Sequence, residues 1–322
     1  MKRMAFGVAA ILAGSVLLNG QAQQVDVGLQ AYQRTSGVSG SVNSVGSDTM
    51  NNMMTLWAET FRKFYPSVKI QVEGKGSSTA PAALIAGTAQ FGPMSRQMRT
   101  TEIDQFEAKY GYKPTELKTS YDALAVYVSK DNPIEKLTLA QVEAIFGKTR
   151  KRGYKQNITT WGQLGLTGDW ANRPISLYGR NSASGTYGFF KEHTLKNGDF
   201  KDTVKEQPGS ASVVQGVTAD RFGIGYSGIG YKTSGVKAVA LSETGTGAYS
   251  NGSYEDVTSG KYPLWRFLYI YINKAPSRPL EPLVAEFVKL MLSKEGQEAV
   301  VKDGYMPLPA KIAQTEAAKV AK

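Results

Sequence analysis

The chain has 322 residues, of which 41% are hydrophobic, and it carries a formal net charge of +11 with no cysteine and a single histidine. This apolar fraction suffices for a packed core, and the length predicts more than one domain. The absence of cysteine excludes disulfides and a lipid-anchored cysteine, and a zinc site would have few ligands to use. Because the basic residues are dispersed and not clustered among aromatic ones, we expect them to attract a small anion and not nucleic acid.

The first residues have the pattern of a secretory signal. A basic start at 1–3 precedes an apolar run at 4–18, and small residues follow at 20–22, where a signal peptidase cleaves. The apolar run is too short for a membrane span. We therefore predict a signal peptide over 1–22, a mature protein free in a bacterial periplasm or secreted, and a flexible polar lead-in over 23–40.

A strand, a helix and a second strand are predicted between residues 42 and 72. Residues 42–45 form the first strand, and apolar residues at helical spacing from Met50 to Phe64 predict a helix capped by Asp48 or Thr49. Alternating residues at 68–72 predict the second strand. This order predicts a βαβ unit in a parallel sheet.

Three turns rich in glycine and hydroxyl residues follow strands of this unit, at 46–49, 74–81 and 91–96. The second turn opens a predicted helix at 82–88, and the third precedes an amphipathic run at 102–109. Ligands of open α/β sheets collect at the carboxyl ends of strands. We therefore expect the hydrogen-bond donors of these turns to share one site.

The rest of the chain predicts a second α/β unit and further elements near the C-terminus. Strands are predicted at 122–128, 175–178, 222–226, 237–241 and 267–272, helices at 137–146 and 283–292, and a fraying tail from residue 310.

The most informative turn spans residues 180–186, between a predicted strand and a predicted helix. Arg180 offers a guanidinium group, while Ser184 and Thr186 offer hydroxyls. The Gly185 amide lies at a helix N-terminus, where unpaired N–H groups and the helix dipole favour an anion. An ordinary Ser/Thr helix cap accounts for the same residues, so this turn alone fits either interpretation.

Taken together, these turns resemble those of the PstS family, the phosphate-binding proteins of bacterial ABC transporters. The resemblance covers residues 44–309 and is most specific at 180–186. Supporting stretches lie at 46–50, 76–78, 91–92, 147–161 and 224–226.

The resemblance implies an α/β fold of the two-domain periplasmic-binding-protein type, class II. Each lobe would be a mixed, mostly parallel sheet flanked by helices, with the ligand in the cleft between the lobes. Lobe I would comprise residues 41–120 and 265–312, lobe II residues 121–264, and a tail residues 313–322.

The resemblance also implies a set of phosphate-binding residues contributed by both lobes. These are Thr49, the Met50 amide, Ser77 and Ser95 from the first lobe, and Arg180, Ser184, Gly185 and Thr186 from the second.

Two positions depart from the family pattern. Many members carry an aspartate where this chain has Ser95, and that carboxylate accepts the proton of hydrogen phosphate and repels sulfate. We expect Asp122 to replace that aspartate as the acceptor and favour this over a purely structural role for Asp122. The reason is that Asp122 begins a strand expected to cross between the lobes. Asp48 is the other candidate, although helix capping accounts for it. Ser182 stands where relatives often have an acid that orients the arginine.

The resemblance implies a monomeric periplasmic receptor that takes up inorganic phosphate and delivers it to an inner-membrane ABC permease, without cofactor, metal or catalysis. Three alternatives remain open from the sequence. The ligand could be sulfate, molybdate or arsenate, and the protein could be a secreted adhesion or matrix protein on the same scaffold. The third alternative is a phosphoester hydrolase. The sequence argues against it, because its single histidine, His193, is expected at a solvated helix position and has no second histidine to work with.

Overall fold

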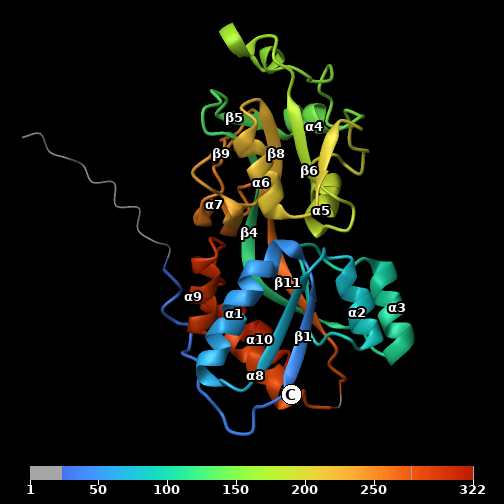
Figure 1. The fold of residues 1–322 in the computed structure, drawn as a ribbon, viewed down its shortest axis with the longest axis vertical. Helices are drawn as coiled ribbons and strands as arrows, with labels where there is room; N and C mark the ends of the chain where they lie inside the picture. Colours follow the sequence, from blue (N-terminus) through green and yellow to red (C-terminus); the bar gives the residue numbers. More distant parts are fainter. Residues whose placement is uncertain (1–23, 277, 322) are drawn as a thin grey trace, which may run out of the picture.

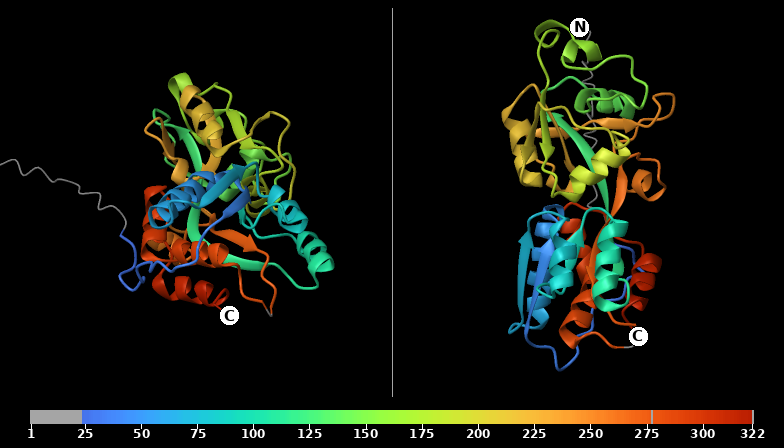
Figure 2. Two further views of the ribbon diagram at one scale, coloured as in Figure 1. Left: turned by 60° about the horizontal axis from the view of Figure 1, so that its bottom comes forward. Right: turned by 90° about the vertical axis from the view of Figure 1, so that its right-hand side faces the viewer.

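The computed structural model describes residues 24–276 and 278–321, so the predicted signal peptide lies outside the described residues. The chain forms two lobes stacked along the long axis of the molecule (Figure 1). Lobe I holds the N-terminal elements together with β11 and the last three helices, and lobe II holds the middle of the chain (Figure 2). Among the described residues, no helix is both long enough and apolar enough to span a membrane.

Lobe I contains the predicted βαβ unit, which the structure confirms. Strands β1 (Ser41–Gly46) and β2 (Lys69–Gly74) pair in parallel and are joined by the 3-10 turn η1 (Asp48–Met50) and helix α1 (Asn51–Phe64). Backbone hydrogen bonds connect β1 to β3 (Gly92–Met94), which pairs with β11 (Trp265–Ile272). Strands β1 and β2 form a two-stranded sheet, and a parallel bridge between Ser44 and Phe91 links it to the larger sheet, which has the order β3-β11-β4 in this lobe.

Strand β4 (Thr115–Ser129) runs through both lobes. Its first part pairs with β11 up to Ala123, and its second part pairs with β8 (Gly223–Gly228) from Leu124 onward. Beyond β8 lie β6 (Ser176–Arg180) and β7 (Val204–Gln207), both in parallel pairing. One hydrogen-bonded sheet thus continues from lobe I into lobe II, and the long strand links them.

The remaining elements flank these sheets or add short strands to the fold (Figure 1). In lobe I they are α2 (Thr79–Ala86), α3 (Thr100–Tyr110), α8 (Pro282–Met291), α9 (Lys294–Lys302) and α10 (Ala310–Ala318). In lobe II they are β5 (Lys136–Thr138), α4 (Leu139–Phe146), η2 (Trp161–Leu164), η3 (Gly168–Trp170), α5 (Gly185–His193), α6 (Ser210–Ala219), η4 (Ile229–Tyr231), β9 (Val236–Ala238), β10 (Ala240–Ser242) and α7 (Tyr254–Thr258).

Helix α1 buries the apolar face that its sequence spacing predicts. Met53, Met54, Trp57 and Phe61 are all fully buried. The Trp57 indole donates a hydrogen bond to the Gly296 carbonyl in α9 at 2.8 Å, so the polar atom of this large side chain also has a partner. The N-terminal and C-terminal parts of the chain therefore share one core in lobe I.

The prediction of a fraying C-terminal tail is wrong. Residues Ala310, Ala313 and Glu316 of α10 are buried, and the Glu316 carboxylate accepts a hydrogen bond from the Lys118 amide of β4 at 3.0 Å. Alanine gives a helix little amphipathic contrast, so a contact made through small side chains leaves a weak signal in the sequence.

The prediction of a flexible lead-in is also wrong for its described part, residues 24–40. This segment has no helix or strand, yet Leu29 and Tyr32 are buried. The Tyr32 hydroxyl donates to the Glu286 carboxylate at 2.7 Å and lies 2.9 Å from the Tyr65 hydroxyl. Isolated anchors of this kind have no periodicity that a sequence pattern could detect.

Replacing Tyr32 by phenylalanine should lower the free energy of unfolding by about 1–3 kcal/mol, because buried Glu286 would lose a hydrogen-bond partner. Urea denaturation of the protein measures this change. Tyr154→Phe is the matched control, since no hydrogen bond of its hydroxyl is found in the described part of the chain. Equal stability of the two variants would contradict the anchoring role of Tyr32.

Candidate functional site

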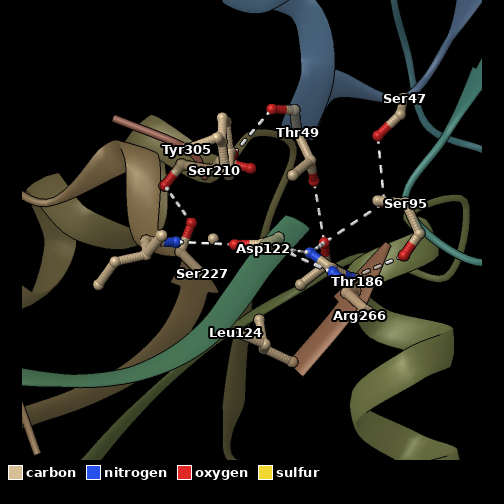
Figure 3. Close-up of polar contacts among 12 residues, drawn as sticks. Ser47, Thr49, Ser95, Asp122, Leu124, Thr186, Ser210, Ser227, Arg266 and Tyr305 are labelled. Carbon is tan, nitrogen blue, oxygen red and sulfur yellow. Dashed lines mark hydrogen bonds and ion pairs between the residues drawn. The ribbon is translucent and has the colours of Figure 1, made fainter. Parts of the chain in front are cut away.

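The donor-rich turns of both lobes meet at one place between the lobes (Figure 3). Strands β1, β2 and β3 run in parallel, so the turns that follow them lie at the same edge of the lobe I sheet. The first turn of α5 approaches this edge from lobe II. The site hydroxyls share nearly complete burial and belong to Ser47, Thr49, Ser77, Ser95, Ser184 and Thr186.

Ser95 lies at the centre of the hydroxyl network. Its Oγ accepts a hydrogen bond from Ser47 Oγ at 3.1 Å and lies 3.3 Å from Ser77 Oγ and 3.5 Å from Thr186 Oγ1. Thr49 Oγ1 and Thr186 Oγ1 are 2.9 Å apart. Since Thr186 belongs to lobe II and the others to lobe I, this network crosses the interface between the lobes.

The turn before α5 contains the helix cap that its sequence allowed, and it also carries a hydroxyl that contacts lobe I. Ser184 is a helix cap, because its Oγ accepts from the amides of Thr186 at 3.1 Å and Tyr187 at 3.3 Å. The Thr186 side chain instead points to lobe I. The Ser184 cap therefore holds the first turn of the helix in place while Thr186, two residues further on, faces lobe I.

Gly185 allows α5 to come this close to lobe I. A Cβ atom at this position would overlap Ser77 Oγ and lie 2.7 Å from Ser95 Oγ. Nearby, the Ser78 amide donates to the Ala183 carbonyl at 3.1 Å, a direct backbone bond between the two lobes. The absence of a side chain at Gly185 is therefore a requirement of the closed arrangement.

Arg266 is a site residue that the sequence reasoning missed. Its Nε and Nη2 donate to Asp122 Oδ2 at 2.9 and 2.7 Å, its Nη1 donates to the Ser95 carbonyl at 2.7 Å, and its Nη2 also donates to Thr186 Oγ1 at 3.0 Å. Arg266 is 3% exposed and Asp122 0%. The guanidinium group thus lies against the hydroxyl network with its counter-charge beside it (Figure 3).

Asp122 and Arg266 are directly opposite each other in the antiparallel ladder of β4 and β11. The other carboxylate oxygen, Asp122 Oδ1, accepts from the Ile229 amide at 3.1 Å. A signal for Arg266 was present in the sequence, because it is a single charge in the run 265–272 of aromatic and aliphatic residues. A buried strand holds a charge only where a partner is supplied, and the predicted strand began one residue too late to include it.

Arg180 ends β6 and is 1% exposed. Its Nη1 donates to Ser210 Oγ at 2.7 Å, and its Nη2 donates to the Pro208 carbonyl at 3.2 Å and lies 3.3 Å from Asp48 Oδ2. No partner for Nε is found within the described residues. Burial lowers the pKa of Arg180, and the charge of Asp48 opposes that shift.

Two sequence predictions at the start of α1 differ from the structure. Asp48 makes no capping hydrogen bond, so that prediction is wrong, and its carboxylate instead reaches lobe II. Thr49 makes no capping bond either. The Met50 amide, expected to be a free donor, donates to the Ser47 carbonyl at 3.2 Å inside the 3-10 turn. The tight 3-10 turn occupies the Met50 amide with an internal hydrogen bond and directs the Asp48 side chain toward lobe II.

The chemistry of this arrangement suits a small oxyanion. Hydroxyl and guanidinium donors converge from two sides in a buried setting, where hydrogen bonds to a charged acceptor are strongest. Among the described residues, no three His, Cys, Asp or Glu side chains are grouped to hold a metal ion. The ring of His193 stacks on Phe189 at 4.0 Å, and its Nδ1 lies 3.1 Å from the Phe189 carbonyl.

Comparison with known proteins places this chain in a family. Residues 31–295 match the model of the PBP superfamily domain. The chain is 56% identical to the phosphate-binding protein PstS of Pseudomonas aeruginosa over 314 residues, which cover 98% of this chain and 97% of that protein. The chain belongs to the PstS family. A more distant relative is the PstS of Bacillus subtilis, which is 27% identical over 84% of this chain and 81% of its own length.

Solved structures agree with the PstS family assignment and with the two-lobed fold. A crystal structure with bound phosphate, of a protein assigned as a phosphate ABC transporter substrate-binding protein from Clostridium perfringens, aligns with a TM-score of 0.69 at 26% identity, over 84% of this chain and 100% of that one. The ABC-type phosphate transport receptor from Vibrio cholerae aligns with a TM-score of 0.63 at 22% identity, over 83% and 100% of the two chains. The protein therefore has the periplasmic-binding-protein fold that its sequence predicts.

Gly185→Ala should weaken oxyanion binding by about tenfold or more, equivalent to about 1.4 kcal/mol, because the added methyl group would hold α5 away from Ser77. Titration calorimetry with phosphate measures the loss. Gly188→Ala, one turn along the same helix, is the control, since its Cβ would lie 3.4 Å from Arg96 Cδ, an ordinary contact. If both variants bound equally, close approach at Gly185 would not matter.

Asp122→Asn should destabilise the ligand-free protein by about 3–5 kcal/mol, because buried Arg266 would lose its counter-charge. Urea denaturation gives the value. Glu73→Gln provides the comparison, because its ion pair with Lys75 is exposed and should contribute about 1 kcal/mol or less. A loss at Asp122 as small as that at Glu73 would rule out the pair as a structural link.

Proposed function

We propose that this protein binds inorganic phosphate between its two lobes and delivers it to an ABC permease. The observation that carries the proposal is the buried set of hydroxyl and arginine donors contributed by both lobes, in a chain of the PstS family. The protein is a transporter substrate-binding protein and not an enzyme. The predicted signal peptide supports a periplasmic location. We also propose that the mature protein acts as a monomer.

The proposed ligand contacts extend the set predicted from the sequence. They comprise Thr49, Ser77, Ser95, Asp122, Arg180, Ser184, Gly185 and Thr186, to which we add Ser47 and Arg266. Met50 is left out, because its amide donates to the Ser47 carbonyl. Each hydrogen bond from these groups to a charged ligand contributes about 1.5–3 kcal/mol, so several of them can offset the dehydration of a small anion. Because the donors come from both lobes, the bound anion favours the closed form.

Selectivity for phosphate depends on an acceptor for the ligand's proton. We propose that Asp122 has this function, because Arg266 Nη2 bridges it to Thr186 and a carboxylate has about four acceptor positions, of which Arg266 and Ile229 leave some free. The serine at position 95 favours a second candidate function, a receptor for an unprotonated oxyanion such as sulfate. A hydroxyl at that position does not repel such a ligand.

Calorimetric titration with phosphate, arsenate and sulfate tests the proposal. Phosphate should bind tightest, and Arg180→Ala should weaken it by about 10- to 100-fold, as expected for the loss of one hydrogen bond from a charged donor. Arg62→Ala, on the exposed face of α1, is the control and should bind like the wild type. Tighter binding of sulfate than of phosphate would overturn the phosphate assignment, and unchanged affinity in Arg180→Ala would remove that residue from the site.

A further inference from the structure

Asp48 belongs to lobe I, but its side chain makes polar contacts with lobe II. Its Oδ2 accepts a hydrogen bond from the Ser210 amide at 2.7 Å and lies 3.3 Å from Arg180 Nη2. Its carbonyl oxygen accepts from the Tyr231 hydroxyl at 2.9 Å. The side chain is 22% exposed, so this residue lies at the edge of the interface between the lobes.

The lobe II surface that receives Asp48 is shaped for a carboxylate. Ser210 is the first residue of the ten-residue helix α6, whose N-terminus favours a negative charge. At the preceding position, Gly209, a Cβ atom would lie 3.2 Å from Asp48 Oδ1. Glycine therefore leaves room for the carboxylate to approach the helix.

Among the described residues, the partners of the Arg180 side chain from its own lobe are neutral: Ser210 Oγ and the Pro208 carbonyl. Ser182, two residues further along the chain, carries no charge. In the described part of the chain, the carboxylate that forms an ion pair with Arg180 is that of Asp48. A buried guanidinium group without a counter-charge is unfavourable, so the lobe that carries Arg180 is incomplete until the other lobe closes on it.

We propose that Asp48 is a positioning residue that latches the closed lobes: closure brings its carboxylate to Arg180 and to the N-terminus of α6, and this fixes the arginine while it slows opening. The inference rests on the proposed function and names a regulating contact of the same site. In this proposal Asp48 bonds Arg180 and the N-terminus of α6 and not the anion, so it favours closure to the same extent for every oxyanion that the site accepts.

Two effects of Asp48 oppose each other. Its negative charge repels an incoming anion and so reduces the association rate, whereas its interlobe contacts hold the closed complex together and reduce the dissociation rate. The contacts act at 2.7 and 3.3 Å, in a setting that excludes most water, while an approaching anion is screened by solvent. The effect on dissociation is therefore the larger one.

Stopped-flow measurement of phosphate binding to Asp48→Asn tests the latch. We expect the dissociation rate to rise about 10- to 100-fold, as for the loss of a hydrogen bond to a charged group, and the association rate to change by less than about threefold. The dissociation constants for phosphate and for sulfate should rise by the same factor. The melting temperature of the ligand-free protein should shift by less than about 2 °C, which separates a latch from a general loss of stability.

Two further variants make the test specific. Tyr231→Phe removes a second interlobe hydrogen bond without a change of charge, and should also raise the dissociation rate, by about two- to tenfold. Asp104→Asn, an exposed acid of α3, should leave both rates unchanged.

An unchanged dissociation rate in Asp48→Asn would overturn the latch. Weaker phosphate but tighter sulfate binding would also overturn it, because Asp48 would then contact the anion itself. Failure of the wild type to bind either anion would instead remove the proposed function. In that case small-angle X-ray scattering of the ligand-free proteins tests the latch. A larger radius of gyration for Asp48→Asn than for the wild type would support the latch, and equal radii would overturn it.

Discussion

The buried ion pair of Arg266 and Asp122 is the interaction on which both the sheet and the site depend. It joins β11 to β4 at the point where β4 leaves lobe I, and Arg266 also holds the Ser95 carbonyl and the Thr186 hydroxyl. Neither charge could remain buried here without the other. The Arg266 guanidinium group bonds Asp122 of the neighbouring strand and also Thr186 of the hydroxyl network. The position of the site is therefore coupled to the pairing of β4 with β11.

Around this pair, the site consists mainly of hydroxyls and backbone brought together by strand ends and helix starts. Such a site is small, and its two halves must meet closely, which accounts for glycine at position 185 and for the direct backbone bond from Ser78 to Ala183. A second carboxylate, that of Asp48, meets Arg180 across the interface. Each arginine is thus balanced by one aspartate, and donors remain available for a small anion.

Sequence patterns were most reliable where one local rule decides the outcome. The βαβ order at 42–72, the buried face of α1 and the capped turn at Ser184 all follow from periodicity or from capping. Predictions from the sequence failed where a side chain could bond either a local or a distant partner. Asp48 could have capped its own helix, and it bonds Ser210 and Arg180 instead; Tyr32 and the helix α10 are held by contacts with residues far away in the chain.

The sequence by itself determined the kind of site, because hydroxyls, an arginine and glycines at strand–helix turns suit an oxyanion in almost any packing, and the family resemblance indicated which oxyanion. Only the tertiary structure decided how the charges are paired. The pairing of Arg266 with Asp122 depends on the register between strands some 140 residues apart, and that of Arg180 with Asp48 on contact between the two lobes. Coulomb interactions follow distances in space, and local sequence patterns report only neighbours along the chain.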